Sequence, residues 1–285
     1  MKEVSEATKR QQESVLNRLE EECQIGRSEG KVELYDTLYE YVKCRIFNPN
    51  TRKNYLAAIL RATADHPEEE LRRYRELAKT THDFLNSERI SQTLPRHRLD
   101  NMLPWYQVQD LKCKAKKILN DEDYLIYCLY TLHPPMRADY WNMRVVKYLT
   151  KKRKEDKENN YCILHDNEGR FIFNKFKTSD THGQIDIPIC DELYDMLKKT
   201  AKMDMPLLQT VHSANALSKR VTEIFEKLSG KTMGIGLLRH SYITTFLSTV
   251  RSLREKTSMA YRMGHSWFTQ ETYHIIENDT DGELA

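Results

Sequence analysis

A cation, an imidazole and a phenol lie close together in the C-terminal part of the sequence. Arg239 lies in LLRHSYITTF (237–246), and His265 and Tyr273 lie in AYRMGHSWFTQETYHI (260–275). An arginine holds phosphoryl oxygens through paired hydrogen bonds, an imidazole donates another, and a phenol can act as a nucleophile. Because an unperturbed phenol has a pKa of about 10, Tyr273 needs nearby positive charge to react. The spacing therefore indicates phosphate chemistry.

Helices are predicted to position these groups. A helix over about 236–250 has an apolar face and leaves Arg239 turned towards a cleft. That face comprises Ile235, Leu238, Tyr242, Phe246 and Leu247. A helix over 252–263 ends at Gly264, a natural left-handed cap, and a short last helix runs through Tyr273.

The Gly-His-Ser motif, a tyrosine eight positions after its histidine and the preceding Leu-Leu-Arg-His-Ser together resemble the tyrosine recombinase (phage integrase) family. The resemblance covers about 100–285 by motif. It assigns five catalytic residues, namely Arg137, Lys177, Arg239, His265 and Tyr273.

Two upstream segments complete the resemblance. LHPPMRADYWNM (132–143) matches the segment that supplies the first arginine, which is Arg137 here, with Asp139 as the acidic residue behind it. FNKFKTSD (173–180) matches the β-hairpin that carries the catalytic lysine. Its Lys-Thr pair indicates Lys177, with Lys175 as the second choice.

The resemblance implies phosphoryl transfer without metal, ATP or any other cofactor. Tyr273 would attack a DNA phosphodiester and form a 3′-phosphotyrosyl link, while both arginines and His265 stabilise the transition state. Lys177 would protonate the departing 5′-oxygen, and the 5′-hydroxyl of a second strand would then attack the phosphotyrosine.

One position departs from the family pattern. The family has a histidine three residues before the second arginine, where this chain has Gly236. The backbone N–H of Gly236 at a helix start could bind an anion instead, or His182 in the hairpin loop could reach the site. His240 also follows the pattern and is interpreted as a structural partner of the site.

The resemblance predicts a site-specific recombinase or integrase, typical of mobile elements, that acts on double-stranded DNA. We expect a tetramer on two DNA sites, with a dimer on each, and an acidic tail (277–285) that could shield the basic cleft. Type IB topoisomerase-like relaxation, telomere resolution and a decayed protein that binds DNA without cutting it remain alternatives.

Four segments are predicted along the chain. Residues 1–30 form a charged helix or arm that ends near Gly26 or Gly30, 31–92 an all-helical core-binding domain, 93–104 a linker and 105–285 the catalytic domain. Within 31–92, NPNT (48–51) predicts a turn in which Asn50 or Thr51 caps the next helix. The predicted DNA contacts are Lys43, Arg45, Arg52, Lys53, Arg96 and Arg98.

The predicted fold is mainly α with a small antiparallel β-sheet. Its three strands are expected in YCILH (161–165), RFIFNKF (170–176) and QIDIPI (184–189), where alternating apolar residues are typical of strands. Helices are expected before and after this sheet, and few glycines and prolines agree with a helical chain.

Composition excludes several classes of protein. With 39% hydrophobic residues among 285, the chain can bury a core and is not a disordered protein. No apolar run approaches the roughly 18 residues that a membrane span needs. The six cysteines form no Cys-x-x-Cys pair, which argues against structural zinc. MKEVSEATKR resembles no signal peptide, so we expect a cytoplasmic or nuclear protein with reduced thiols.

Overall fold

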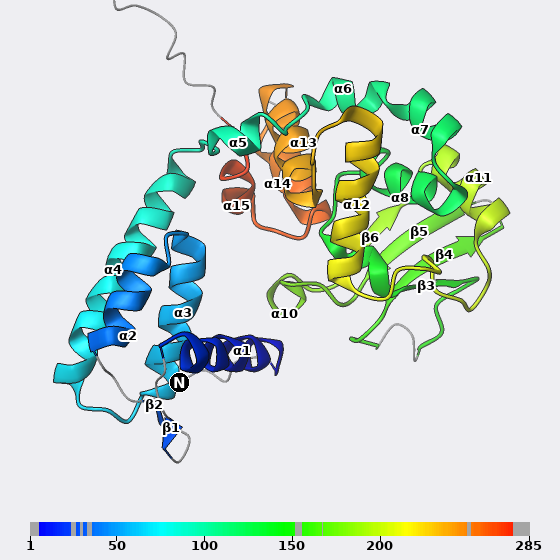
Figure 1. The fold of residues 1–285 in the computed structure, drawn as a ribbon. Helices are drawn as coiled ribbons and strands as arrows, with labels where there is room; N and C mark the ends of the chain where they lie inside the picture. Colours follow the sequence, from blue (N-terminus) through cyan, green and yellow to red (C-terminus); the bar gives the residue numbers. More distant parts are fainter. Residues whose placement is uncertain are drawn as a thin grey trace, which may run out of the picture. The chain divides into compact units, whose positions relative to one another are not determined.

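The computed structural model divides the chain into two compact units, Met1–Ser91 and Gln92–Ala285 (Figure 1). It describes residues 6–23, 27–28, 31–32, 36–151, 156–166, 168–249 and 252–275. The predicted acidic tail and the predicted end of the first helix lie outside these residues. Among the described helices, none is long and apolar enough to cross a membrane.

The first unit is a small helical bundle. Its elements are α1 (Glu6–Cys23), α2 (Asp36–Glu40), a π-helical turn (Tyr41–Arg45), α3 (Pro49–Ala62) and α4 (Glu68–Ile90). Apolar side chains at helical spacing, among them Leu19, Leu38, Leu56, Ile59 and Tyr74, form its buried core. The strands β1 (Arg27–Ser28) and β2 (Lys31–Val32) pair antiparallel, so the expectation of an entirely helical segment from residue 31 is wrong at its start.

The start of α3 also differs from the prediction. Asn48 is the N-cap, because its side-chain oxygen accepts hydrogen bonds from the backbone N–H groups of Asn50 (3.0 Å) and Thr51 (3.1 Å). Pro49 then occupies the first helical position, where its missing N–H costs nothing. The prediction of a cap at Asn50 or Thr51 is therefore wrong, because both residues lie inside the helix.

The four predicted DNA contacts of this unit fall into two groups. Lys43, Arg45 and Lys53 are exposed. Arg52 instead donates from Nε to the carbonyl of Ile46 (3.0 Å) and from Nη2 to that of Lys43 (3.1 Å). Arg52 thus fixes the end of the π-helical turn, while the other three cations face solvent.

The second unit contains a four-stranded sheet in the order β3 (Met143–Val146), β4 (Asn160–His165), β5 (Glu168–Phe173) and β6 (Ile185–Pro188). The last three strands pair antiparallel, with Phe171 opposite both Cys162 and Ile187. The mainly helical fold with a small sheet is confirmed. However, β3 was not predicted, and because it pairs parallel to β4 the sheet is mixed rather than purely antiparallel.

Helices precede this sheet in sequence, interrupt it between β5 and β6, and follow it. They are α5 (Arg96–Leu99), α6 (Trp105–Asp110), α7 (Lys112–Ile118), α8 (Asp121–Thr131), a 3₁₀ turn (Ala138–Asn142), α10 (Ser179–His182), α11 (Asp191–Thr200), α12 (Ala214–Ser229), α13 (Ile235–Thr249), α14 (Leu253–Arg262) and α15 (Trp267–Glu271).

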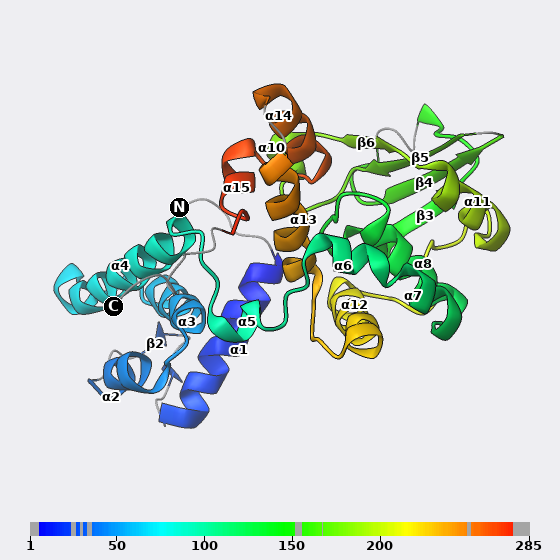
Figure 2. The ribbon, with the colours of Figure 1, turned by 90° about the horizontal axis from the view of Figure 1, so that it is seen from above.

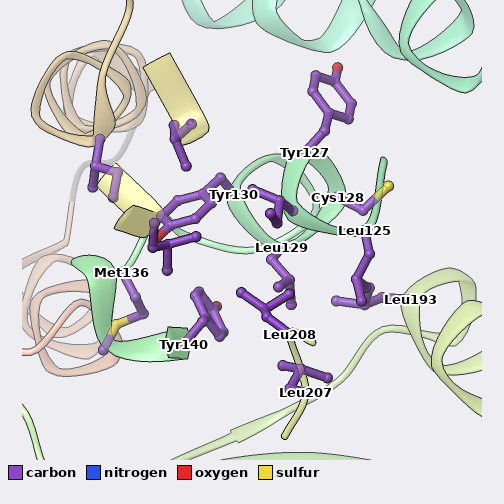
Figure 3. Packing of buried hydrophobic residues seen from close by; sticks show 14 of the residues in the cluster. Leu125, Tyr127, Cys128, Leu129, Tyr130, Met136, Tyr140, Leu193, Leu207 and Leu208 are labelled. Atoms are coloured by element: carbon purple, nitrogen blue, oxygen red, sulfur yellow. The ribbon is translucent and has the colours of Figure 1, made fainter. Parts of the chain in front are cut away.

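Helix α8 forms the centre of the core of this unit. Every residue from Leu125 to Thr131 is buried, and a helix that is buried all round must pack on several neighbours. Figure 3 shows its side chains among residues of α11, of the 3₁₀ turn and of the segment before α12. Tyr130 meets Tyr140 edge to face, with ring centres 5.6 Å apart. Tyr130 also donates to the carbonyl of Arg137 (2.9 Å), so this core borders the loop that carries Arg137.

Residues 93–104, predicted as a linker, lie in the second unit. Asn101 Oδ1 accepts hydrogen bonds from the backbone N–H (2.9 Å) and the hydroxyl (2.8 Å) of Thr232. Lys231 donates to the carbonyl of Asp100, and Leu103 joins the core. These contacts attach α5 to the segment that leads into α13.

A buried amide connects the loop of Arg137 with the end of the hairpin. Asn160 is fully buried, and its Nδ2 donates to the carbonyls of Asp139 (2.8 Å) and Lys175 (3.0 Å). Its Oδ1 accepts from the backbone N–H groups of Asn174 (2.9 Å) and Lys175 (2.8 Å). One side chain thus holds together two segments that carry candidate site residues.

Replacing this amide should destabilise the second unit. Because Asn160→Ala leaves several buried polar groups without partners, we expect the free energy of unfolding to fall by about 2–4 kcal/mol. Urea unfolding followed by tryptophan fluorescence reports this unit, since Trp105, Trp141 and Trp267 all belong to it. The control Asn215→Ala alters an exposed amide and should change stability by less than about 0.5 kcal/mol. Equal stability of both variants would contradict the role of Asn160.

Candidate active site

Three helices bring the C-terminal candidates together. Helices α13, α14 and α15 lie beside one another in both ribbon views (Figures 1 and 2). Arg239 of α13 is only 1% exposed, so its side chain is buried rather than turned to an open cleft. It donates to the carbonyls of Pro135 (2.6 Å) and Met263 (3.4 Å) and to Nδ1 of His265 (2.8 Å). A buried guanidinium needs such acceptors, and here they come from the segments just before Arg137 and around the end of α14.

The contact with Arg239 determines which nitrogen of His265 carries the proton. A guanidinium can only donate, so Nδ1 of His265 accepts and the proton of the neutral ring lies on Nε2. Burial, followed by the charges of Arg239 and Arg137, lowers the pKa of His265 to about 3. At neutral pH His265 is therefore an uncharged donor.

Two hydrogen-bond donors of this cluster are unused. Among the described residues, neither Nε of Arg239 nor Nε2 of His265 has a partner, although both atoms are buried. A buried donor without an acceptor costs about 1–3 kcal/mol. An anionic oxygen bound here would recover that cost at both atoms.

Tyr273 packs directly on this pair. Its ring stacks on that of His265 with centres 5.6 Å apart, and Cζ of Arg239 lies 5.1 Å from its centre. The ring of His240, the next residue of α13, is tilted against that of Tyr273 with centres 4.8 Å apart, and its Nδ1 donates to the carbonyl of Tyr273 (2.8 Å). His240 thus contacts both the backbone and the ring of Tyr273, a position suited to the buttressing role expected from the sequence.

The charge of the site acts on the phenol. Burial by itself would raise the pKa of Tyr273, but the opposing effects of Arg239 and Arg137 outweigh it and lower the pKa below the usual 10. The positive charge that the sequence required near this tyrosine is therefore present.

Arg137 and the hairpin meet at the backbone of Gly264. The carbonyl of Gly264 accepts from Nη1 of Arg137 (3.3 Å) and from the hydroxyl of Thr178 (2.7 Å). Gly264 has φ +68°, as predicted for a left-handed cap, and a Cβ there would lie 3.2 Å from the ring of Phe176. Glycine is required at this position for both reasons.

The hairpin presents two lysines in different environments. Lys177 is exposed, directly precedes Thr178, and has no ion pair among the residues that the structure describes. Lys175 pairs with Glu158 (2.9 Å). Because Lys175 is already paired, the arrangement favours Lys177 as the lysine available to a substrate.

The two proposed substitutes for the missing histidine differ in position. Gly236 is the second residue of α13 and is exposed, so its N–H points from a helix N-terminus. His182 donates from Nε2 to the carbonyl of Tyr261 (3.1 Å) and stacks on that ring, with centres 5.0 Å apart. In this arrangement His182 is held by α14 rather than by the Arg239 cluster.

Several residues around the site were not identified from the sequence. The hydroxyl of Tyr130 donates to the carbonyl of Arg137 (2.9 Å), and Nε2 of Gln92 donates to the carbonyl of Glu271 (2.6 Å), two residues before Tyr273. Thr178 and Asn160 belong to the same group. The Lys-Thr pair was the only sequence signal that pointed to any of these residues.

No family model matches this sequence, and no curated protein matches it. A crystal structure of XerA recombinase is similar over 97% of this chain and 89% of that chain, with a TM-score of 0.43 and 11% identity. Within the described residues, no three histidine, cysteine or acidic side chains are grouped as a metal site would require.

The two arginines should control the titration of Tyr273. With ¹³C at Cζ of tyrosine, NMR should show Tyr273 titrating below pH 10, and Arg137→Ala should raise its pKa because a stabilising charge is lost. Arg170→Ala removes an arginine paired with Asp186 in the sheet and should leave the pKa of Tyr273 unchanged. An unchanged pKa in Arg137→Ala would contradict the electrostatic coupling.

A second titration concerns Asp139. Burial raises the pKa of this carboxyl to about 6, although Arg137 and Arg239 oppose the shift. Between about pH 4 and 6 the folded chain then holds a proton that the unfolded chain has lost, so stability decreases as pH rises through this window.

The effect can be measured against Asp139→Asn, which lacks this titration. From pH 4 to pH 7 the wild-type chain should lose up to about 3 kcal/mol of unfolding free energy relative to the variant. Urea unfolding at both pH values, read by tryptophan fluorescence, gives this difference. Parallel pH dependence of the two chains would mean that Asp139 titrates normally.

Proposed function

We propose that this chain is a site-specific DNA recombinase that cleaves and rejoins strands through a phosphotyrosyl intermediate on Tyr273. The observation that carries this proposal is the pair of unused buried donors, on Arg239 and His265, beside a tyrosine of lowered pKa. A phosphodiester brings the anionic oxygens that these donors lack. The similarity to a recombinase structure is compatible with this function but is too weak to support it.

In strand cleavage, the hydroxyl of Tyr273 would lose its proton to water, and its oxygen would attack phosphorus. The bond from phosphorus to the 5′-oxygen would break. Arg137, Arg239 and His265 would hold the non-bridging oxygens as negative charge develops. Lys177 would give a proton to the departing 5′-oxygen. Reversal with the 5′-hydroxyl of another strand rejoins the DNA, so no ATP is consumed.

The remaining residues would bind and assemble DNA. Exposed Lys43, Arg45 and Lys53 in the first unit, together with Arg96, provide cations for phosphates. Exchange between two duplexes requires chains acting together, which is the reason to propose a tetramer on two sites. A topoisomerase-like activity would instead relax supercoiled DNA without joining two sites.

Covalent capture tests the central step. A pool of nicked duplexes with randomised sequence around the nick is incubated with the chain in EDTA, and protein-linked DNA is recovered under denaturing conditions. We expect a covalent adduct, located by mass spectrometry on Tyr273, that disappears in Tyr273→Phe because no nucleophile remains, while non-covalent DNA binding persists.

Tyr106→Phe is the matched control. It removes the same hydroxyl group from a tyrosine that is 63% exposed and lies outside the cluster. It should form the adduct at the wild-type rate. An adduct in Tyr273→Phe would remove Tyr273 from its role. DNA binding without any adduct in the wild-type chain would favour the decayed, non-cleaving alternative.

A further inference from the structure

We propose that Arg98 is a further catalytic residue, whose guanidinium contacts the reacting phosphate in the space that Gly236 leaves open. This role rests on the proposed function, because it requires a phosphodiester at Tyr273. Arg98 was expected only as one of several basic contacts near a linker. The structure gives it a particular place.

The position of Arg98 follows from α5. Nη2 of Arg98 lies 3.6 Å from the point that a Cβ on residue 236 would occupy. The hydrogen bonds from Thr232 to Asn101 hold α5 against the segment that leads into α13. The guanidinium is therefore held over the first turn of the helix that carries Arg239.

Helix geometry places Gly236 on the same side as the cluster. Residues three and four apart on a helix are neighbours on one face, so Gly236 lies next to both Arg239 and His240. Those two residues contact the ring of Tyr273. A group over Gly236 is thus one helical turn from the residues that hold the nucleophile.

The charge of Arg98 reaches this face of α13. Burial is the largest cause that lowers the pKa of His240 to about 4, and the positive charges of Arg98 and Arg239 lower it further. Arg98 is also half-buried, and among the described residues nothing pairs with its guanidinium. The neighbouring Arg96, by contrast, is 91% exposed and lies 3.4 Å from Asp100.

Arg98 is a half-buried cation over Gly236, and the fully buried Arg239 follows one helical turn later on α13. The positive charges of both arginines act on His240, and a phosphate that both arginines contact would offset the two charges together. Arginine presents a planar fork that fits two phosphoryl oxygens, and it stays charged at every accessible pH. It can therefore supply the hydrogen bond that the absent histidine would make.

Glycine at 236 is part of the same arrangement. A methyl group there would be in ordinary contact with Arg98. Because an imidazole is much larger than a methyl group, we infer that a histidine at 236 would compete with Arg98 for the same space.

The test compares single-turnover adduct formation on one nicked duplex taken from the captured pool. Arg98→Ala should slow adduct formation by about 100-fold, the usual loss for a donor to the transition state. Arg170→Ala, which removes an arginine paired with Asp186, is the matched control and should react at the wild-type rate. Equilibrium binding to the intact duplex should fall less than tenfold in Arg98→Ala.

Two further measurements separate catalysis from structure. Adding Gly236→His to Arg98→Ala should recover at least tenfold in rate, whereas Gly236→His alone should slow the reaction. A neutral methylphosphonate at the cleaved position should shrink the defect of Arg98→Ala, while the same group one phosphate away should not, because only charge on the reacting phosphate is offset by Arg98.

The proposal is overturned if Arg98→Ala reacts as fast as Arg170→Ala, or if its defect is the same on phosphate and on methylphosphonate. A wild-type chain that forms no adduct on any duplex would instead overturn the proposed function, and the role of Arg98 with it. If Tyr273→Phe forms no adduct but Arg98→Ala reacts normally, the proposed function stands and Arg98 has no catalytic role.

Discussion

The burial of Arg239 is the constraint on which the rest of the site depends. A guanidinium at 1% exposure is stable only where fixed acceptors replace water, and here these are two carbonyls and the imidazole of His265. To supply these acceptors, the segment at Pro135 and the C-terminal end of α14 must both pack against α13. The same arrangement then fixes the tautomer of His265 and places a cation against the ring of Tyr273. The placement of Tyr273 is therefore a consequence of satisfying one buried charge.

A second point of convergence links this cluster to the sheet. The carbonyl of Gly264 accepts from both Arg137 and Thr178, so the loop after α8 and the hairpin are held at one atom. Asn160 joins the same two segments from the sheet side. Two independent connections thus hold the hairpin backbone beside Lys177, while the side chain of Lys177 is exposed to solvent. Such a lysine can approach a substrate that is bound outside the protein core.

The sequence predicted the longer helices, the hairpin and the C-terminal cluster, because these follow from local periodicity and short motifs. It did not predict the short helices α5 and α10, which lie in the predicted linker and in the predicted hairpin loop. It also did not predict β3, whose four residues pair parallel with β4 and also bond through their backbone to the segment around Pro206. The burial of Arg239, the amide connections of Asn160 and the position of Arg98 depend on contacts between residues far apart in the chain. Local patterns contain no information about such contacts, whereas backbone requirements such as the left-handed Gly264 were visible in the order of residues.

The stretch 92–101 contacts the elements around the site at two places. Gln92 donates to the carbonyl of Glu271, two residues before Tyr273, and Arg98 lies over the first turn of α13. Gln92 also adopts φ +55°, a backbone conformation that costs energy for a residue other than glycine. Such strain persists only where other contacts enforce it, and the hydrogen bond to Glu271 is one of them. A displacement of this stretch would act on the contact with Glu271 and on Arg98 together, so the first residues of the second unit help to shape the surroundings of Tyr273.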